Sequence, residues 1–337
     1  MLDIRENVSL QEFNTLALNV FARYFFEANN AVQIPALFDF ADRHQLPVLL
    51  LGDGSNVVIA KDFSGLVVKI SLFGISTEEH DDAVIVTAAA GENWHQLVTT
   101  CLHNGYYGIE NLALIPGTVG AAPIQNIGAY GVELSDVLVS VSGWDRQHKN
   151  WCHLEKDQCE LAYRDSIFKR QKKDNFVITA VTLKLSKQAA IKNSYQALQK
   201  SLEQQSITQP TPQQIADTVA AVRKSKLPDP SELANVGSFF KNPMVSCEQA
   251  KQLLEEFPGM VQYSQSTGVK LAAGWLLEQA GWKGKRIGNV GMHGQQSLVL
   301  INYGKASGSD VLELADAIKS DILATFGVHL TIEPMVI

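Results

Sequence analysis

Apolar runs along the first 185 residues predict mostly β-strands joined by few helices. Residues 47–51 are wholly apolar apart from their proline, as is typical of a strand buried on both faces. The stretch 92–103 instead has helical spacing and is followed by Gly105 as a C-terminal cap. The runs that predict strands are 21–28, 47–51, 57–60, 66–70, 83–90, 137–141 and 176–185.

Beyond residue 186 the pattern becomes mainly helical. Thr211, followed by Pro212 and Gln214, forms a capping box that predicts a helix ending in the basic residues 223–226. Helices are also predicted at 193–205, after Ser246, at 270–280 and after Ser309. Alternation in residues 328–332 predicts a C-terminal strand with Glu333 on its polar face.

Residues 111–132 have a composition unlike the rest. No charged residue lies between Glu110 and Glu133, but four glycines and two prolines exclude a regular helix or strand. No block of 18 apolar residues is present, so the stretch is no membrane span. Two interpretations remain: a tightly packed connection, or a buried loop whose backbone groups bind a large ligand.

Composition narrows the class of protein. The 337 residues suggest two or three domains, and 46% hydrophobic with 19% charged residues is ordinary for a soluble protein. A net charge of −7 argues against a dedicated nucleic-acid or membrane binder. The four cysteines and eight histidines have no metal-ligand spacing, so we expect no metal site, and the N-terminus is no signal peptide. We therefore expect a cytoplasmic protein.

Four features carry candidate chemistry, and each has an ordinary alternative. Arg164 could simply form an ion pair with its neighbour Asp165, and Ser238, after Gly237, could simply cap a turn. Glu333 could be an ordinary solvated side chain. The turn 52–56 has clustered backbone N–H groups suited to binding phosphate, but a plain hairpin turn would have the same sequence pattern. No Gly-x-Ser-x-Gly motif surrounds Ser238, which argues against a serine hydrolase.

Six blocks, in order, resemble those of the UDP-N-acetylmuramate dehydrogenase (UDP-N-acetylenolpyruvoylglucosamine reductase, MurB) family. Tyr163-Arg164 and Gly237-Ser-Phe-Phe240 distinguish it from FAD oxidases of related fold, and Tyr195 indicates its longer subclass, which has a tyrosine-bearing loop. The resemblance covers nearly the whole chain. The blocks are Leu51-Gly-Asp-Gly-Ser-Asn56, Ala90-Gly-Glu-Asn-Trp-His95, Ile115 to Gly131, Tyr163-Arg-Asp-Ser-Ile-Phe168, Gly237-Ser-Phe-Phe-Lys-Asn-Pro243 and Lys270-Leu-Ala-Ala-Gly-Trp-Leu-Leu277.

The resemblance implies an α+β fold. A two-part FAD-binding module of the vanillyl-alcohol-oxidase/PCMH type is expected, followed by a smaller α/β substrate-binding domain. The first FAD-binding subdomain would be residues 1–70, joined by the strand 327–337. The second would be 71–226, and the substrate-binding domain 227–326.

The implied reaction is an early step of peptidoglycan synthesis, and the resemblance therefore also implies a role in cell shape and cell division. With NADPH as co-substrate and FAD as cofactor, the enolpyruvyl ether of UDP-N-acetylglucosamine becomes the lactyl ether of UDP-N-acetylmuramate. The implied roles are proton donation by Ser238 and carboxylate contact by Arg164 and Glu333. The implied cofactor residues are Gly52, Gly54, Ser55, Asn56, Pro116, Gly117, Gly120, Ala121, Ala122, Gln125, Asn126, Gly128 and Tyr130, and the substrate residues are Tyr195, Lys226, Asn242, Tyr263 and Gln296.

One departure concerns Ala121-Ala122, where relatives often carry serine, so backbone N–H groups would replace a hydroxyl contact to the flavin. Two other functions are kept as alternatives. One is an FAD oxidase acting on an alcohol, and the other is a non-catalytic nucleotide-sugar binding protein, suggested by the basic residues 223–226. We expect a monomer that binds neither nucleic acid nor membrane.

Overall fold

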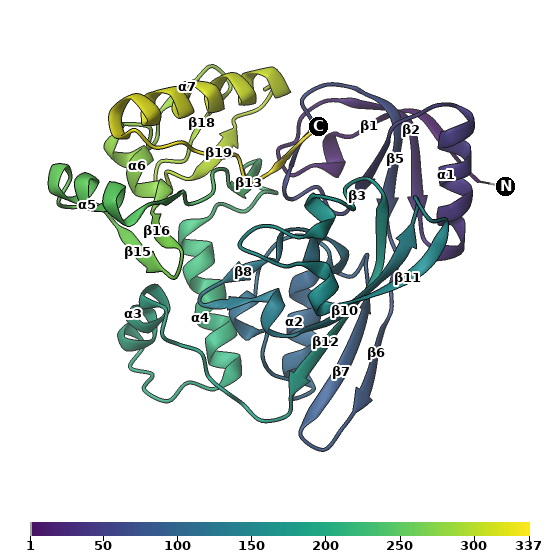
Figure 1. Ribbon diagram of the computed structural model, residues 1–337, viewed down its shortest axis with the longest axis horizontal. Helices are drawn as coiled ribbons and strands as arrows, with labels where there is room; N and C mark the ends of the chain where they lie inside the picture. Colours follow the sequence, from purple (N-terminus) through teal and green to yellow (C-terminus); the bar gives the residue numbers. More distant parts are fainter. Residues whose placement is uncertain (1) are drawn as a thin grey trace. The chain divides into compact units, whose positions relative to one another are not determined.

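Apolar runs near the N-terminus form a four-stranded sheet in the order β1-β2-β5-β3, in which β5 pairs in parallel with β2 and β3. In the computed structural model, which describes residues 2–337, helix α1 (Ile34–Arg43) packs on this sheet through Ile34, Leu37 and Phe38 (Figure 1). The strands are β1 (Arg5–Ser9), β2 (Phe21–Ala28), β3 (Val48–Leu51) and β5 (Phe63–Ile70).

A five-stranded antiparallel sheet follows, in the order β11-β10-β12-β7-β6. Side chains alternate between buried and half-buried along β7, as the sequence pattern predicts for a sheet covered mainly on one face. Helix α2 (Trp94–His103) and then the loop 111–132 come between β7 and β10 in the chain. The strands are β6 (Ile75–Glu79), β7 (Ala83–Ala89), β10 (Leu138–Asp145), β11 (Asn150–Glu155) and β12 (Phe176–Ser186).

The chain folds as two compact units. Unit 1 comprises residues 1–8, 22–53 and 63–225, and unit 2 comprises 9–21, 54–62 and 226–337. Unit 1 holds both sheets described above, together with α3 (Gln196–Gln204) and most of α4 (Pro212–Lys226). The three-domain division expected from the sequence is finer than this and stays a prediction.

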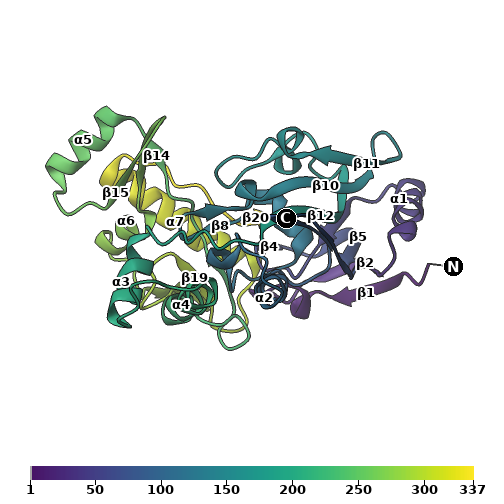
Figure 2. The same ribbon diagram turned by 90° about the horizontal axis from the view of Figure 1, so that it is seen from below.

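Unit 2 is built on a sheet in the order β13-β19-β18-β17. Helix α7 (Gly308–Phe326) presents its apolar stripe, including Val311, Leu314 and Ile318, to the core and packs against β18 and α6 (Figures 1 and 2). The other elements are α5 (Cys247–Glu256), α6 (Ala273–Gln279), β4 (Val57–Val58), β13 (Asn235–Ser238), β14 (Met244–Val245), β15 (Gln262–Gln265), β16 (Gly268–Leu271), β17 (Arg286–Ile287), β18 (Val290–Met292), β19 (Val299–Asn302) and β20 (Met335–Val336).

Most predicted elements are present, with shifted ends. The predicted helix 270–280 begins only at Ala273, because Lys270 and Leu271 belong to β16, which pairs with β14 and β15. The predicted strand 328–332 was wrong in extent. Ile332 makes only an isolated bridge to Phe240, and the terminal strand is β20, which pairs with β4. Long-range pairing therefore decided both boundaries.

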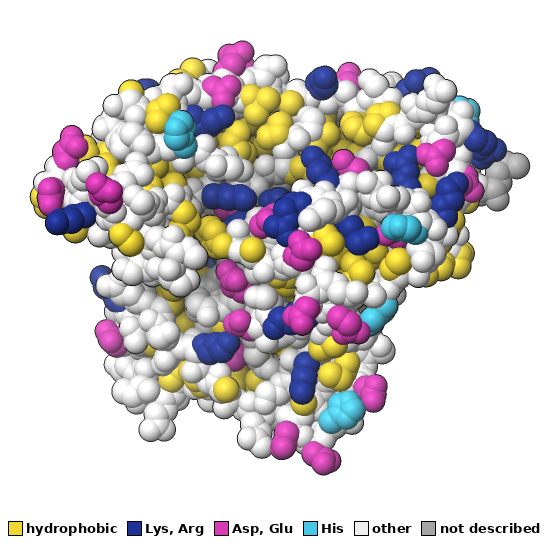
Figure 3. Space-filling model, in the orientation of Figure 1, with side chains coloured by type: hydrophobic (Ala, Val, Ile, Leu, Met, Phe, Trp, Pro, Cys, Tyr) yellow, Lys and Arg dark blue, Asp and Glu magenta, His cyan; other side chains and the backbone are white. Residues whose placement is uncertain are grey.

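On the face that Figure 3 shows, acidic side chains lie among basic ones. Within residues 2–337, no helix is long and apolar enough to cross a membrane.

Candidate active site

The uncharged stretch 111–132 is a chain of short 3₁₀ turns rather than a regular element. These turns are η3 (Glu110–Leu112), η4 (Val119–Ala121) and η5 (Pro123–Gln125), followed by the two-residue strands β8 (Gly128–Ala129) and β9 (Val132–Glu133). Most of its residues are buried or half-buried. The buried, irregular loop expected from the sequence is therefore confirmed.

The segment 90–94 binds this loop through backbone hydrogen bonds. Val119 N–H donates to Glu92 O at 2.8 Å, Gly120 N–H to Ala90 O at 2.9 Å, and Trp94 N–H to Gly117 O at 3.0 Å. The protein itself satisfies these loop groups, so they do not by themselves require a ligand. At Gly120 the two segments are so close that an added Cβ would lie 2.6 Å from Ala90 Cβ.

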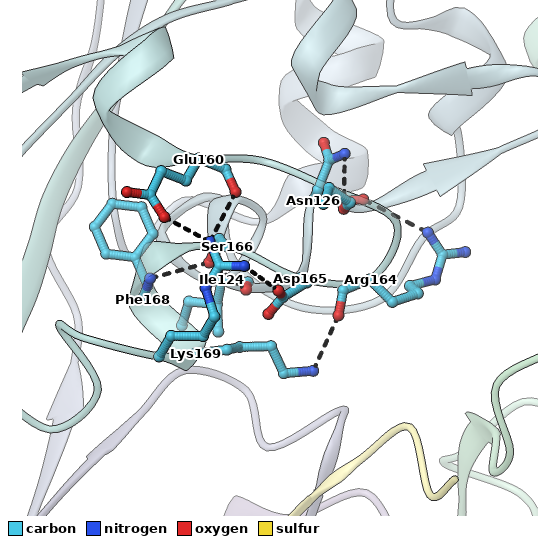
Figure 4. Close-up of polar contacts among 10 residues, drawn as sticks. Ile124, Asn126, Glu160, Arg164, Asp165, Ser166, Phe168 and Lys169 are labelled. Atoms are coloured by element: carbon cyan, nitrogen blue, oxygen red, sulfur yellow. Dashed lines mark hydrogen bonds and ion pairs between the residues drawn. The ribbon is translucent and has the colours of Figure 1, made fainter. Parts of the chain in front are cut away.

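Residues 162–166 bind the second half of the loop. The Arg164 guanidinium extends toward Asn126, as Figure 4 shows, and donates to Gly128 O at 2.8 Å. Ser166, which is fully buried, donates through Oγ to Ile124 O at 2.6 Å. Asp165, the next residue, forms an ion pair with Arg170.

Asn126 is almost completely buried and organises the loop from within. Its side chain donates to Glu133 Oε2 at 2.9 Å and accepts from Ser135 N–H at 2.9 Å. Its left-handed backbone conformation, with φ of 44°, ends the turn η5. These contacts give this predicted cofactor residue a structural function.

Cationic and phenolic groups gather beside the loop in unit 1. The half-buried Arg223 guanidinium interacts electrostatically with Tyr130 and Arg164. Burial raises the pKa of Tyr130, Arg223 lowers it, and nearby Tyr195 raises it. The rings of Tyr130 and Tyr195 lie edge to face, 5.3 Å between centroids. This grouping is suited to anionic parts of a ligand.

The turn 52–56 is divided between the two units. In unit 1, Gly52 lies against the loop, because an added Cβ would be 2.7 Å from Thr118 Oγ1. In unit 2, Gly54 is buried with φ of 62°, and Asn56 O accepts a hydrogen bond from Met335 N–H at 3.0 Å. Ser55 is half-buried beside them in sequence.

Ser238 and Glu333 lie on neighbouring segments of unit 2. Glu333 N–H donates to Phe239 O at 2.9 Å, directly after Ser238 at the end of β13. Gly237 has φ of 71°, a conformation that L residues rarely adopt, and its N–H is bonded to Asn235 Oδ1. Ser238 is exposed and Glu333 half-buried. The structure therefore places the two segments that carry these predicted residues side by side.

The predicted substrate residues of unit 2 occupy varied positions. Asn242 accepts a hydrogen bond from Ala273 N–H at 3.0 Å and so helps to cap α6. Gln296 precedes β19 and its N–H donates to His293 Nδ1 at 3.2 Å. Tyr263 on β15 is 44% exposed, and Lys226 is exposed at the end of α4.

Curated relatives match the chain over its full length. It is 45% identical to the UDP-N-acetylenolpyruvoylglucosamine reductase of Chromobacterium violaceum, covering 100% of this chain and 99% of that protein. It is 46% identical to the reductase of Pseudomonas syringae pv. syringae and 43% identical to that of Pseudomonas aeruginosa. Each match covers 99% of this chain and 98% of the relative. This chain belongs to the UDP-N-acetylenolpyruvoylglucosamine reductase family.

Two family models match separate parts of the chain. Residues 22–147 match an FAD binding domain, and residues 229–337 match the C-terminal domain of UDP-N-acetylenolpyruvoylglucosamine reductase. The reductase structure from Thermus caldophilus has the same fold, with a TM-score of 0.67, 20% identity, and 100% and 99% of the two chains covered. The predicted fold class, an FAD-binding module followed by a smaller C-terminal domain, is confirmed.

The residues present fit FAD. Gly120 and Gly52 permit close packing where a side chain would collide, and the loop carries small uncharged side chains at Ala121 and Ala122. Arg164 and Arg223 supply positive charge beside it. An uncharged wall with adjacent cations suits a flat flavin that carries a diphosphate.

Sequence reasoning missed two residues beside the loop, His95 and Arg223. His95 accepts a hydrogen bond from Leu114 N–H, and Arg223 donates to Leu114 O. His95 lies within a block used for the family resemblance and Arg223 within the basic run 223–226, but no local pattern indicates that both reach Leu114.

Proposed function

We propose that this protein is the NADPH-dependent, FAD-containing reductase that converts UDP-N-acetylglucosamine enolpyruvate to UDP-N-acetylmuramate. The observation that carries the proposal is full-length identity of about 45% to reductases of that name. The reaction belongs to peptidoglycan precursor synthesis. We further propose that the enzyme belongs to the longer subclass with the tyrosine-bearing loop and works as a cytoplasmic monomer.

FAD binding is assigned to Gly52, to residues 54–56 and to the loop 116–130. When bound, FAD supplies the two-electron chemistry that couples NADPH oxidation to reduction of the enolpyruvyl double bond. The loop excludes water by its uncharged surface, which strengthens nearby electrostatic interactions.

Addition of hydride to C3 of the enolpyruvyl double bond leaves negative charge at C2, and this charge spreads into the substrate carboxylate. In the proposal, the Arg164 guanidinium and Glu333 contact that carboxylate, and the Ser238 hydroxyl donates the proton to C2. A preorganised donor aimed at developing charge contributes about 3–4 kcal/mol. A serine hydroxyl is a weak acid, so its proton transfer depends on such neighbours.

Substrate binding is assigned to Tyr195, Lys226, Asn242, Tyr263 and Gln296, opposite the diphosphate, uridine and sugar. Lys226 suits the diphosphate because it is an exposed cation at the end of α4. The three-domain division, with residues 1–70 and 327–337, 71–226, and 227–326, is part of the same proposal.

The test is an absorption spectrum of the purified protein followed by anaerobic titration with NADPH and then with the enolpyruvyl substrate. We expect a yellow protein that NADPH bleaches and that the substrate reoxidises without oxygen. Rapid reoxidation by oxygen without need for that substrate would instead identify an oxidase. A colourless protein that does not take up FAD would leave a nucleotide-sugar binding protein and refute the proposal.

A further inference from the structure

Leu114, just before the proposed flavin loop, has a left-handed backbone conformation with φ of 59°. A leucine there is unfavourable, because its Cβ crowds the following carbonyl oxygen. Such a conformation persists only where surrounding contacts impose it. The conformation matters because Leu114 directs the chain into residues 115–120.

Two side chains from distant helices hold the peptide groups of Leu114. Its N–H donates to Nδ1 of His95 at 3.1 Å, and His95 is the second residue of α2. Its carbonyl oxygen accepts from Arg223 Nε, near the end of α4, also at 3.1 Å. These two hydrogen bonds, called here the Leu114 clamp, satisfy both polar groups of a single strained residue.

His95 must be neutral to accept this bond, because an imidazolium has no free lone pair. Burial lowers the pKa of His95, and the positive charges of Lys224 and Arg223 lower it further. The acceptor is therefore preserved at neutral pH.

The clamp lies next to contacts that continue the same attachment. Trp94, beside His95, donates through Nε1 to Leu112 O at 3.0 Å and through its backbone N–H to Gly117 O at 3.0 Å. The start of α2 thus binds the chain on both sides of Leu114. We propose that His95 and Arg223 are positioning residues that hold Leu114 in its left-handed conformation and thereby preorganise the loop 115–120 for FAD. This inference rests on the proposed function of the loop.

The experiment compares His95→Leu with His95→Asn in the full-length protein. Asparagine retains an acceptor where Nδ1 lies, whereas leucine does not. Two readouts are used: the FAD dissociation constant, from flavin fluorescence titration of the FAD-free protein, and amide hydrogen exchange of residues 114–120. We expect His95→Leu to weaken FAD binding about five- to tenfold, as expected for one hydrogen bond, and to accelerate exchange. His95→Asn should stay within about twofold of the parent.

Leu114→Gly supplies the decisive comparison. Glycine adopts a positive φ without strain, so the loop should then depend less on the clamp. The double variant His95→Leu/Leu114→Gly should bind FAD more tightly than His95→Leu alone. His103→Leu, at the exposed end of the same helix, is the matched control and should change neither readout.

Arg223 provides an independent test if His95→Leu does not fold. Arg223→Gln keeps an N–H near the position of Nε but removes the charge, and Arg223→Met removes both. Faster exchange in the methionine variant than in the glutamine variant supports the clamp.

The proposal is overturned if His95→Asn is as impaired as His95→Leu, if glycine at 114 gives no recovery, or if the two Arg223 variants exchange alike. A parent protein that binds no FAD refutes the proposed function instead, while the exchange measurements still decide the clamp.

Discussion

At Arg164 the backbone φ is 52°, which costs an L residue about 1–2 kcal/mol. The guanidinium compensates by bonding Gly128 O, and an added Cβ at Gly128 would lie 3.3 Å from Arg164 Nη1. The sequence alone left Arg164 as either a structural or a functional cation. Its geometry places it on the loop, where both functions are compatible.

For Arg164→Lys we expect substrate-driven flavin reoxidation to slow by about 10²–10³-fold, since an ammonium does not reproduce planar two-donor contact with a carboxylate. Stopped-flow absorbance measures this step. Arg170→Lys is the control, because Arg170 is exposed and pairs with Glu160 and Asp165. Near-normal turnover of Arg164→Lys would remove Arg164 from the site.

For Ser238→Ala we expect NADPH to bleach the flavin at a near-normal rate, while reoxidation by substrate slows about 10²–10⁴-fold. The reason is that proton donation belongs only to the second half-reaction. The exposed Ser264 on β15 provides a matched Ser→Ala control. Equal slowing of both half-reactions would refute the assignment of Ser238.

At the scale of elements, helix ends were predictable because their signals are local. Thr211 Oγ1 accepts from Gln214 N–H, and the Gln214 side chain bonds Thr211 N–H, as its capping box predicts. The helix after Ser309 begins slightly earlier, at Gly308, because Ser307 is its cap. Strand β6 was not predicted, because all five of its residues are exposed and no apolar alternation marks it.

The end of strand β10 carries a testable electrostatic contact. Asp145 is buried, and burial by itself raises the pKa of its carboxyl group. Hydrogen bonds from Lys172 and from the His148 N–H and ring lower that pKa by more, so the net pKa is well below its normal value. Because the folded-state pKa is depressed, this stabilisation is present above the unfolded pKa of about 4 and is lost as pH falls below it.

For Asp145→Asn we therefore expect a free energy of unfolding lower by about 2–3 kcal/mol at pH 7. The difference from the parent should shrink below about pH 4. Urea unfolding at pH 7 and pH 3.5 measures it, with the exposed Asp157→Asn as control. A difference independent of pH would contradict the ionic account.

At the scale of the whole molecule, three of the four cysteines differ in exposure between the two units. Cys101 and Cys159 are buried in unit 1, whereas Cys247 of unit 2 is exposed. Burial raises the pKa of the Cys101 thiol to about 12, and burial together with Glu155 raises that of Cys159 to about 11. Both are therefore protonated and unreactive at pH 8.

We expect a thiol reagent at pH 8 to modify Cys247 rapidly in the folded protein. Cys101 and Cys159 should react only after denaturant unfolds unit 1, because reaction requires an accessible thiolate. Mass spectrometry of modified peptides measures the order of reaction. Modification of Cys101 in the native protein at a rate close to that of Cys247 would contradict the buried core described here.

The sequence by itself determined most helices and strands and the irregular loop 111–132, because periodicity, caps and glycine spacing depend on near neighbours in the chain. Its motifs indicated the family, and the resemblance to that family implied the α+β class. Only the tertiary structure decided that residues 162–166 bind residues 124–128, that Glu333 lies beside Phe239, and that His95 and Arg223 meet at Leu114. Such contacts join residues up to 109 positions apart, and long-range hydrogen bonds leave no local pattern from which to predict them.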